Sequence, residues 1–273
     1  MKVFIVADIE GVAGVTRPTQ CQQGNTEYEG ARGLMEGEVN AAIEGALLAG
    51  ATRIVVADSH GTMGNLRADN IHPAAELVQG KPREFSMAQG IETDHFDAVA
   101  FIGLHSPASV KGVLAHTING RAFHRVELNG KVVGESDLYA AFAAEHGTPL
   151  VLTSGDDCFS QWVSKRHPEV EAVCVKTMHS TVSAQSLSPQ TARKLLREAM
   201  EKTLSRPLPS VTPHFTAPFS IRLTTTRPVL ADGFAMLPGI VQEEAQVVSF
   251  TCDDMGGVIR TLGALSLYSG SLL

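Results

Sequence analysis

Short apolar runs alternate with amphipathic segments along the first two-thirds of the chain. The apolar runs are rich in Val, Ile and Ala and lack the polar alternation of a half-exposed strand. Strands that are covered on both faces have this pattern, which predicts an α/β fold with a mostly parallel central sheet flanked by helices. The predicted strands are residues 2–8, 53–61, 97–106, 149–157 and 171–177.

Helical periodicity marks two long segments. Apolar side chains recur at helical spacing from residue 28 to residue 49, and Gly50 is a typical helix end. A second helix is expected to begin at Ser188-Pro189, because serine is a favoured N-cap and proline is tolerated in the first turn. Its apolar face carries Leu195, Leu196, Ala199, Met200 and Leu204.

The remaining segments predict two excursions from this pattern. Residues 121–134 read as a β-hairpin, in which Asn129-Gly130 forms a tight turn between two strand-like segments. Residues 206–218 contain four prolines and are predicted to be a linker. We therefore expect an α/β domain over residues 1–204 and a small C-terminal α+β subdomain over residues 205–273, used for packing or assembly.

Composition and charge narrow the functional classes. Of the 273 residues, 44% are hydrophobic and 19% are charged, which supports a substantial core. The formal net charge of -7 gives no electrostatic reason to expect a nucleic-acid partner. The four scattered cysteines are typical of free thiols in a reducing compartment. Because no apolar stretch has the length of a membrane span or a signal peptide, we expect a soluble, cytoplasmic protein without a membrane partner.

Chemically active residue types gather at the ends of the apolar runs. In open parallel sheets, the carboxyl ends of the strands form one edge, and ligands bind in the crevice outside it. Residues that are far apart in the sequence are therefore expected to meet at one edge. The four groups are Asp8-x-Glu10-Gly11, Asp58-Ser59-His60-Gly61, Gly103-Leu104-His105 and Gly155-Asp156-Asp157.

Two carboxylates and two imidazoles at this edge predict a metal site. Asp8 and Glu10 share a strand face because side chains alternate with a period of two. Together with His60 and His105 they form a ligand set suited to Zn²⁺ or a similar ion. Glu135, at the end of the hairpin, is a possible fifth ligand. Five protein ligands exceed those of one open catalytic zinc, so two metal ions are plausible.

Each ligand candidate also has a simpler interpretation. Asp8 is compatible with a helix N-cap or a surface carboxylate, and His60 with a turn residue. His105 is compatible with a buried core histidine, and Glu135 with a cap of the helix that starts at Ser136. These simpler interpretations would have to hold independently at several strand ends. The joint pattern therefore favours the metal site.

Other polar residues carry different expectations. His116, in GVLAHTING, is a candidate for proton transfer because the ordinary pKa of histidine lies near working pH. Asp156 and Asp157 follow a glycine and are typical turn formers. Five further histidines are expected at the surface: His72, His95, His146, His167 and His214.

Five motifs in order resemble the zinc-dependent D-aminopeptidases of the bacterial dipeptide-transport operon type. They are the DxEG that begins at Asp8, the DSHG at 58–61, the GxH that ends at His105, the HT at 116–117 and the NG…VGE that ends at Glu135.

The resemblance implies a site with two zinc ions per subunit. Asp8 would bridge the ions, His116 would be the catalytic residue, and Glu10, His60, His105 and Glu135 would complete the ligand shells. It also implies ring-shaped homodecamers of two stacked pentamers, and short peptide substrates with an N-terminal D-amino acid, such as D-Ala-D-Ala.

Two segments depart from the family pattern. Ser136-Asp137-Leu138-Tyr139 stands where the family has small or amide residues, and the segment after Lys176 lacks the expected glycine pattern. Neither departure touches the predicted ligands.

The predicted function is metal-dependent removal of the N-terminal residue of short peptides. A two-metal phosphoesterase, or another amide hydrolase, is an alternative because Asp/His strand-end sites also suit phosphate esters. A non-catalytic, metal-stabilised binding or assembly protein is an alternative of another class. Closed structural zinc sites favour Cys and His ligands, so the carboxylate-rich set counts against it.

Overall fold

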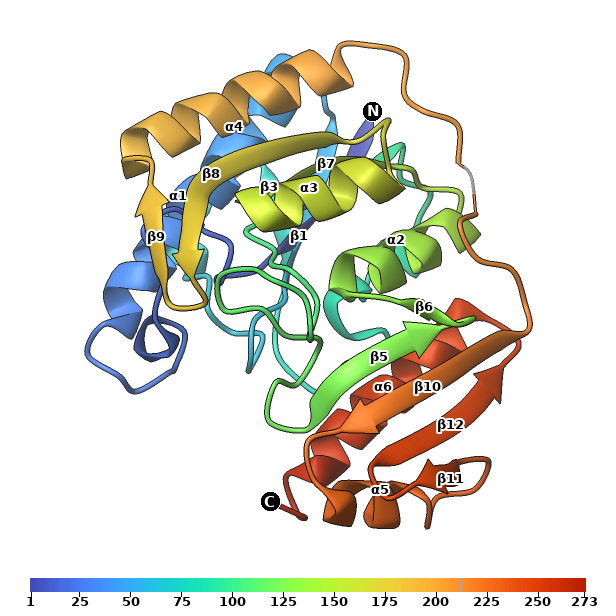
Figure 1. The fold of residues 1–273 in the computed structure, drawn as a ribbon. Helices are drawn as coiled ribbons and strands as arrows, with labels where there is room; N and C mark the ends of the chain where they lie inside the picture. The colour runs from blue at the N-terminus through green and yellow to red at the C-terminus, as the bar shows by residue number, and fades with distance from the viewer. Residues whose placement is uncertain (212) are drawn as a thin grey trace.

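The computed structural model describes residues 1–211 and 213–273 (Figure 1). A seven-stranded sheet has the order β3-β2-β1-β4-β7-β8-β9, in which every neighbouring pair is parallel except β8 and β9. The predicted fold class is confirmed. The strands are β1 (Lys2–Ala7), β2 (Arg53–Asp58), β3 (Ala75–Val78), β4 (Ala98–Ile102), β7 (Leu150–Asp156), β8 (Glu171–Ser180) and β9 (Ser183–Ser186).

Helices cover both faces of this sheet. Side chains of β1 alternate between two buried clusters, with Val3 and Ile5 in one and Phe4 and Val6 in the other. The first cluster packs against α1 (Tyr28–Leu48) and α4 (Pro189–Leu204), and the second against α2 (Glu135–Glu145) and α3 (Asp157–Arg166). The absence of polar alternation in these strands follows from this two-sided burial.

A second sheet is antiparallel and has the order β11-β12-β10-β5-β6. The predicted hairpin is confirmed in β5 (Phe123–Leu128) and β6 (Lys131–Val132), and Asn129 and Gly130 have the positive φ angles of its turn. The C-terminal elements are β10 (Phe219–Thr225), α5 (Pro228–Phe234), β11 (Val241–Glu244), β12 (Val247–Cys252) and α6 (Met255–Ser269).

The two halves of the chain share this second sheet. β5 pairs with β10, so the hairpin and the C-terminal strands lie side by side in the lower part of Figure 1. α6 packs against both β12 and α2. The division at residue 204 stays a prediction, and the linker predicted at 206–218 includes residue 212, which lies outside the described residues. Among the described residues, no helix is both long and apolar enough to cross a membrane.

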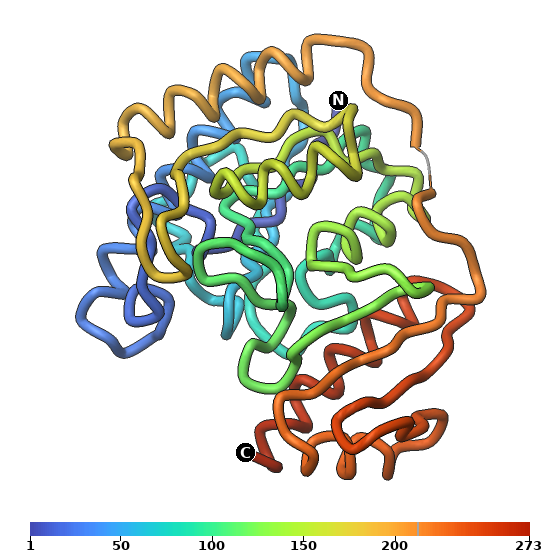
Figure 2. Tube along the Cα trace, in the orientation of Figure 1, coloured from blue at the N-terminus to red at the C-terminus, as the bar shows by residue number. Residues whose placement is uncertain are grey.

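The strand order creates a switch point beside β1. From β1 the chain proceeds to β2 and β3 on one side, then crosses to β4 on the other. Ligands bind outside the carboxyl ends of the strands at such points. The long segment 103–122 follows β4 without a helix or strand and loops over the centre of the molecule (Figure 2, green).

The loops that follow β1 and β4 are in direct contact. The amide of Gly11 donates to the carbonyl of Gly103 at 2.7 Å. A Cβ atom on Gly11 would lie 1.9 Å from the carbonyl oxygen of Leu104, and one on Gly103 would lie 2.3 Å from that of Asp8. Only glycine permits this approach, which brings the residues after β1 close to those after β4.

Candidate metal centre

The five predicted metal ligands and His116 converge on one cluster at the switch point. His60 Nδ1 lies 3.2 Å from Asp8 Oδ1 and 2.9 Å from Glu10 Oε2. His105 Nε2 lies 3.4 Å from Asp8 Oδ2 and 3.5 Å from Glu135 Oε2. Asp8 therefore presents one carboxylate oxygen to each histidine.

Four different elements supply these side chains. Asp8 and Glu10 follow β1, His60 follows β2 and His105 follows β4. Glu135 is the first residue of α2, and its Oε1 accepts a hydrogen bond from the amide of Ile118 at 2.5 Å. That bond ties the loop after β4 to the start of α2.

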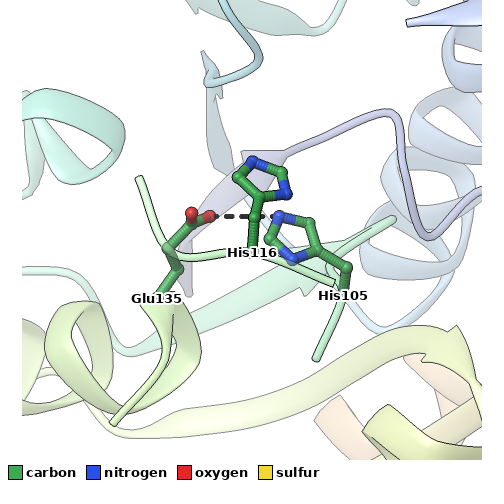
Figure 3. Close-up of side chains that lie close together, drawn as sticks. All are labelled: His105, His116 and Glu135. Carbon is green, nitrogen blue, oxygen red and sulfur yellow. Dashed lines mark ion pairs between the residues drawn. The ribbon is translucent and has the colours of Figure 1, made fainter. Parts of the chain in front are cut away.

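His116 stacks on His105. The ring centroids are 4.0 Å apart and the planes differ by 14°. Figure 3 shows the two rings face to face, with the carboxylate of Glu135 pointing toward His105. The ligand atoms of His105, His116 and Glu135 lie within 4.8 Å of one another, so His116 is part of the cluster.

A backbone carbonyl orients each histidine. His60 Nε2 lies 2.7 Å from the carbonyl oxygen of Cys21, and His105 Nδ1 lies 3.0 Å from that of Ser106. His116 Nδ1 lies 2.9 Å from the carbonyl oxygen of Leu114. A carbonyl only accepts, so the nitrogen facing it carries the proton. In the neutral rings the opposite nitrogens then keep their lone pairs, as in metal-ligating histidines.

Burial makes the charges of this cluster interdependent. Burial acts to raise the pKa of Asp8, yet hydrogen bonds and charge attraction from His105 and His60 hold it well below its ordinary value. Burial acts to lower the pKa of His105, but Glu135 and Asp8 raise it to about 10. The pKa of His60 is raised well above its ordinary value, against burial, by Glu10 and Asp8. Cationic charge is strongly favoured at this position.

The donor atoms fit a metal ion. Glu10 Oε2 and His105 Nε2 are buried and make no well-aligned hydrogen bond among the described residues, although imidazole and carboxylate groups of the cluster stand beside them. Buried polar atoms rarely lack a well-aligned hydrogen bond. A cavity of about 110 Å³ lies against the cluster, lined by Asp8, His60, His116 and Glu135 among others. Carboxylate and imidazole donors of this kind can hold Zn²⁺.

Sequence reasoning missed Lys176, which stands beneath the centre. It is fully buried in β8, and its Nζ donates to the carbonyls of Glu10 at 2.5 Å, Val12 at 3.0 Å and Val15 at 2.6 Å. Burial lowers the pKa of Lys176 to about 8, against the negative charge of Glu38. One ammonium group thus holds the loop that carries Glu10. The available signal was a lysine that directly follows the apolar run at residues 172–175.

Asp156 is a structural residue at the same edge. Its Oδ1 accepts from the amide of Phe159 at 2.8 Å and caps α3. Its Oδ2 accepts from the amide of Val113 at 2.6 Å. Asp156 therefore joins the start of α3 to the backbone at Val113, three residues before His116.

Three comparisons place the chain among known proteins. The family model described as D-aminopeptidase matches residues 1–264. A D-aminopeptidase of Bacillus subtilis (strain 168) is 34% identical over 198 residues, which are 72% of each chain. The solved structure of the Zn-dependent D-aminopeptidase DppA from Bacillus subtilis, described as a self-compartmentalizing protease, has a TM-score of 0.90 and 28% identity. The alignment of the two structures covers 98% of this chain and 97% of the DppA chain.

The three carbonyls around Lys176 give a prediction about stability. Lys176→Met removes their donor inside the protein, so the free energy of unfolding should fall by roughly 2–4 kcal/mol in urea denaturation. Lys165→Met, at an exposed position of α3, should change it by less than about 0.5 kcal/mol. Equal stability of the two variants would show that the ammonium group does not hold the loop.

Proposed function

This chain belongs to the D-aminopeptidase family, and we propose from that premise that it removes the N-terminal residue of short peptides, including peptides of D-amino acids such as D-Ala-D-Ala. The family predicted from five sequence motifs is confirmed. The prediction of a metal-dependent aminopeptidase is confirmed with it. The site residues, the number of metal ions and the substrate remain proposals.

The observation that carries the proposal is the two-sided position of Asp8. Its Oδ1 lies near His60 and its Oδ2 near His105. Asp8, Glu10 and His60 would hold one zinc ion, and Asp8, His105 and Glu135 would hold a second. Three protein donors per ion is the number typical of catalytic zinc sites.

Bound zinc supplies two functions to this site, a lowered pKa for water and polarisation of the scissile carbonyl. The carboxylates orient the donors and balance the charge. In the neutral rings, the backbone carbonyls of Cys21 and Ser106 hold the proton on the far nitrogen, so that the nitrogens of His60 and His105 that face the cluster would keep their lone pairs for zinc.

His116 is assigned to proton transfer. Its Nδ1 is held by the carbonyl of Leu114, so Nε2 is free to exchange a proton. The residue lines the cavity and stacks on a proposed ligand. From this position His116 can protonate the leaving amine or stabilise the developing oxyanion.

The shape of the site favours short substrates. The cavity at the cluster shares Met63, Lys81 and Ile118 with a neighbouring cavity of about 340 Å³. Together they offer room for a few residues beyond the scissile bond. Lys81 adds positive charge where the carboxylate of a dipeptide would lie.

We also propose that the chain assembles into a homodecamer of two stacked pentamers in the cytoplasm. The self-compartmentalizing relative supports the assembly. Exposed apolar side chains on the C-terminal unit support it too, since Met236, Val241 and Leu267 are 78%, 62% and 53% exposed. The four free cysteines are consistent with a reducing compartment.

The function is tested by hydrolysis of D-Ala-D-Ala, L-Ala-L-Ala and p-nitrophenyl phosphate before and after chelation. We expect cleavage of the D-dipeptide, faster than the L-dipeptide by about tenfold or more. Activity should vanish on chelation and return with zinc, and the metal centre should account for two of the zinc ions bound per chain. Faster hydrolysis of the phosphate ester than of either dipeptide would instead identify a phosphoesterase.

The role of His116 is tested by His116→Ala. This variant should keep its zinc content but lose about 10²–10⁴-fold in kcat, because only proton transfer is removed. His124→Ala, at an exposed position of β5, is the matched control and should retain the parent rate. Parent activity in His116→Ala would refute the assignment.

The assembly is tested by light scattering. Ten chains of 29.0 kDa have a mass of about 290 kDa. Met236→Asp combined with Val241→Asp should reduce that mass, because charge on an apolar contact opposes association. Val182→Asp, 51% exposed in the turn after β8, should leave it unchanged. A monomeric parent protein would contradict the proposal.

A further inference from the structure

Three ligand-type side chains form a second cluster, outside the metal centre. His167 Nδ1 lies 3.0 Å from His214 Nε2, and His214 Nε2 lies 3.8 Å from Glu169 Oε1. The ligand atoms of the three residues lie within 4.8 Å of one another. None of them is among the described residues that line the cavity of the metal centre. This cluster therefore needs an explanation of its own.

The expected surface position of His167 is wrong. The residue follows α3 directly and is 4% exposed, because the segment after α4 covers it. That segment carries His214 and passes beside α2, as the orange trace in Figure 1 shows. Sequence reasoning places loop histidines at the surface but has no information about which segment folds over them.

The donors and the available space suit a small cation. Two imidazole nitrogens and one carboxylate are a known zinc donor set. A small cavity of about 20 Å³ adjoins the cluster and is lined by His167, Glu169 and His214 among others. A space of roughly 10–15 Å³ already holds one water molecule. An ion that replaces the contact between the two histidines would keep an open position for water.

Asp137 lies behind the buried histidine. His167 Nε2 has no hydrogen-bond partner among the described residues, and the nearest carboxylate oxygen is Asp137 Oδ1 at 3.8 Å. Asp137 is itself held by Arg166 Nε at 3.1 Å and by Trp162 Nε1 at 3.1 Å. A carboxylate behind the distal nitrogen is the usual support of a metal-ligating histidine.

Asp137 is also part of the Ser136-Asp137-Leu138-Tyr139 stretch that departs from the family pattern. Its Oδ2 accepts from the amide of Gly134 at 2.8 Å, so it caps the helix that begins with Glu135. Asp137 thus connects the second cluster to α2. The proposed ligands of the metal centre are unaffected by this difference from the family pattern.

We propose that His167, Glu169 and His214 bind a divalent cation of the zinc type. The ion fastens the segment between α4 and β10 to the turn between α3 and β8. Three protein donors hold it, water completes the shell, and Asp137 supplies negative charge behind His167. The site acts as a clamp on this segment and is independent of peptide hydrolysis.

Zinc content at buffered free zinc concentrations tests the proposal on the full chain. We compare the parent protein, His214→Ala and Glu169→Gln, with His124→Ala as the control for loss of an exposed histidine. His214→Ala should bind one zinc ion fewer per chain, and Glu169→Gln should bind that ion at least about tenfold more weakly. His124→Ala should match the parent. Equal zinc binding by the parent and His214→Ala over the whole range would overturn the proposal and leave a hydrogen-bonded histidine pair.

Proteolysis supplies a second measurement that does not depend on activity. Zinc should slow cleavage within residues 205–218 of the parent protein severalfold and leave the cleavage rate of His214→Ala unchanged. Equal zinc effects on the two proteins would also overturn the clamp. Thermal unfolding of both proteins checks that His214→Ala is folded, so the result stands even if no peptide is hydrolysed.

Discussion

An excess of buried negative charge is the constraint on which the structure depends. The carboxylates of Asp8, Glu10 and Glu135 lie beside the imidazoles of His60, His105 and His116 in a setting that water barely reaches. Burying such a group is costly unless opposite charge stands beside it. Protons on His60 and His105 or metal ions at the same position can supply that charge, and the two compete. The stability of the fold and the affinity for metal ions therefore both depend on how the charge of these carboxylates is neutralised.

The parallel sheet was predictable because its strands are buried on both faces. That burial removes polar alternation from segments such as 2–8 and 97–106, and the pattern is visible in the sequence alone. Short elements such as β3 and β9 were not predicted. Each of these strands has four residues, all of them partly buried or exposed, and the sequence of each shows no clear hydrophobic period. The hairpin was predicted from Asn129-Gly130, but its pairing with β10 was not, because partners that distant leave no local signal.

The residues of the candidate centre were predictable for a different reason. Asp8, Glu10, His60 and His105 follow apolar runs, and the topology of parallel sheets brings the ends of such runs together. The supports around them were not predictable. Backbone carbonyls orient the three histidines, and Lys176 holds the loop after β1, through contacts that depend on tertiary structure. The burial of His167 was not predicted for the same reason, since it is covered by a segment whose His214 lies 47 residues later in the sequence.

The contact between α2 and α6 has a consequence for the order of synthesis. Glu135 opens α2, and α2 packs against a helix near the end of the chain. At their junction the amide of Met255 donates to both carboxylate oxygens of Glu145 at 3.0 Å. While the ribosome is still producing the last strands, Asp8, Glu10 and His60 are already available, but the support of Glu135 is not. In the order of synthesis, Asp8, Glu10 and His60 therefore precede the helix that packs against α2 and so supports Glu135.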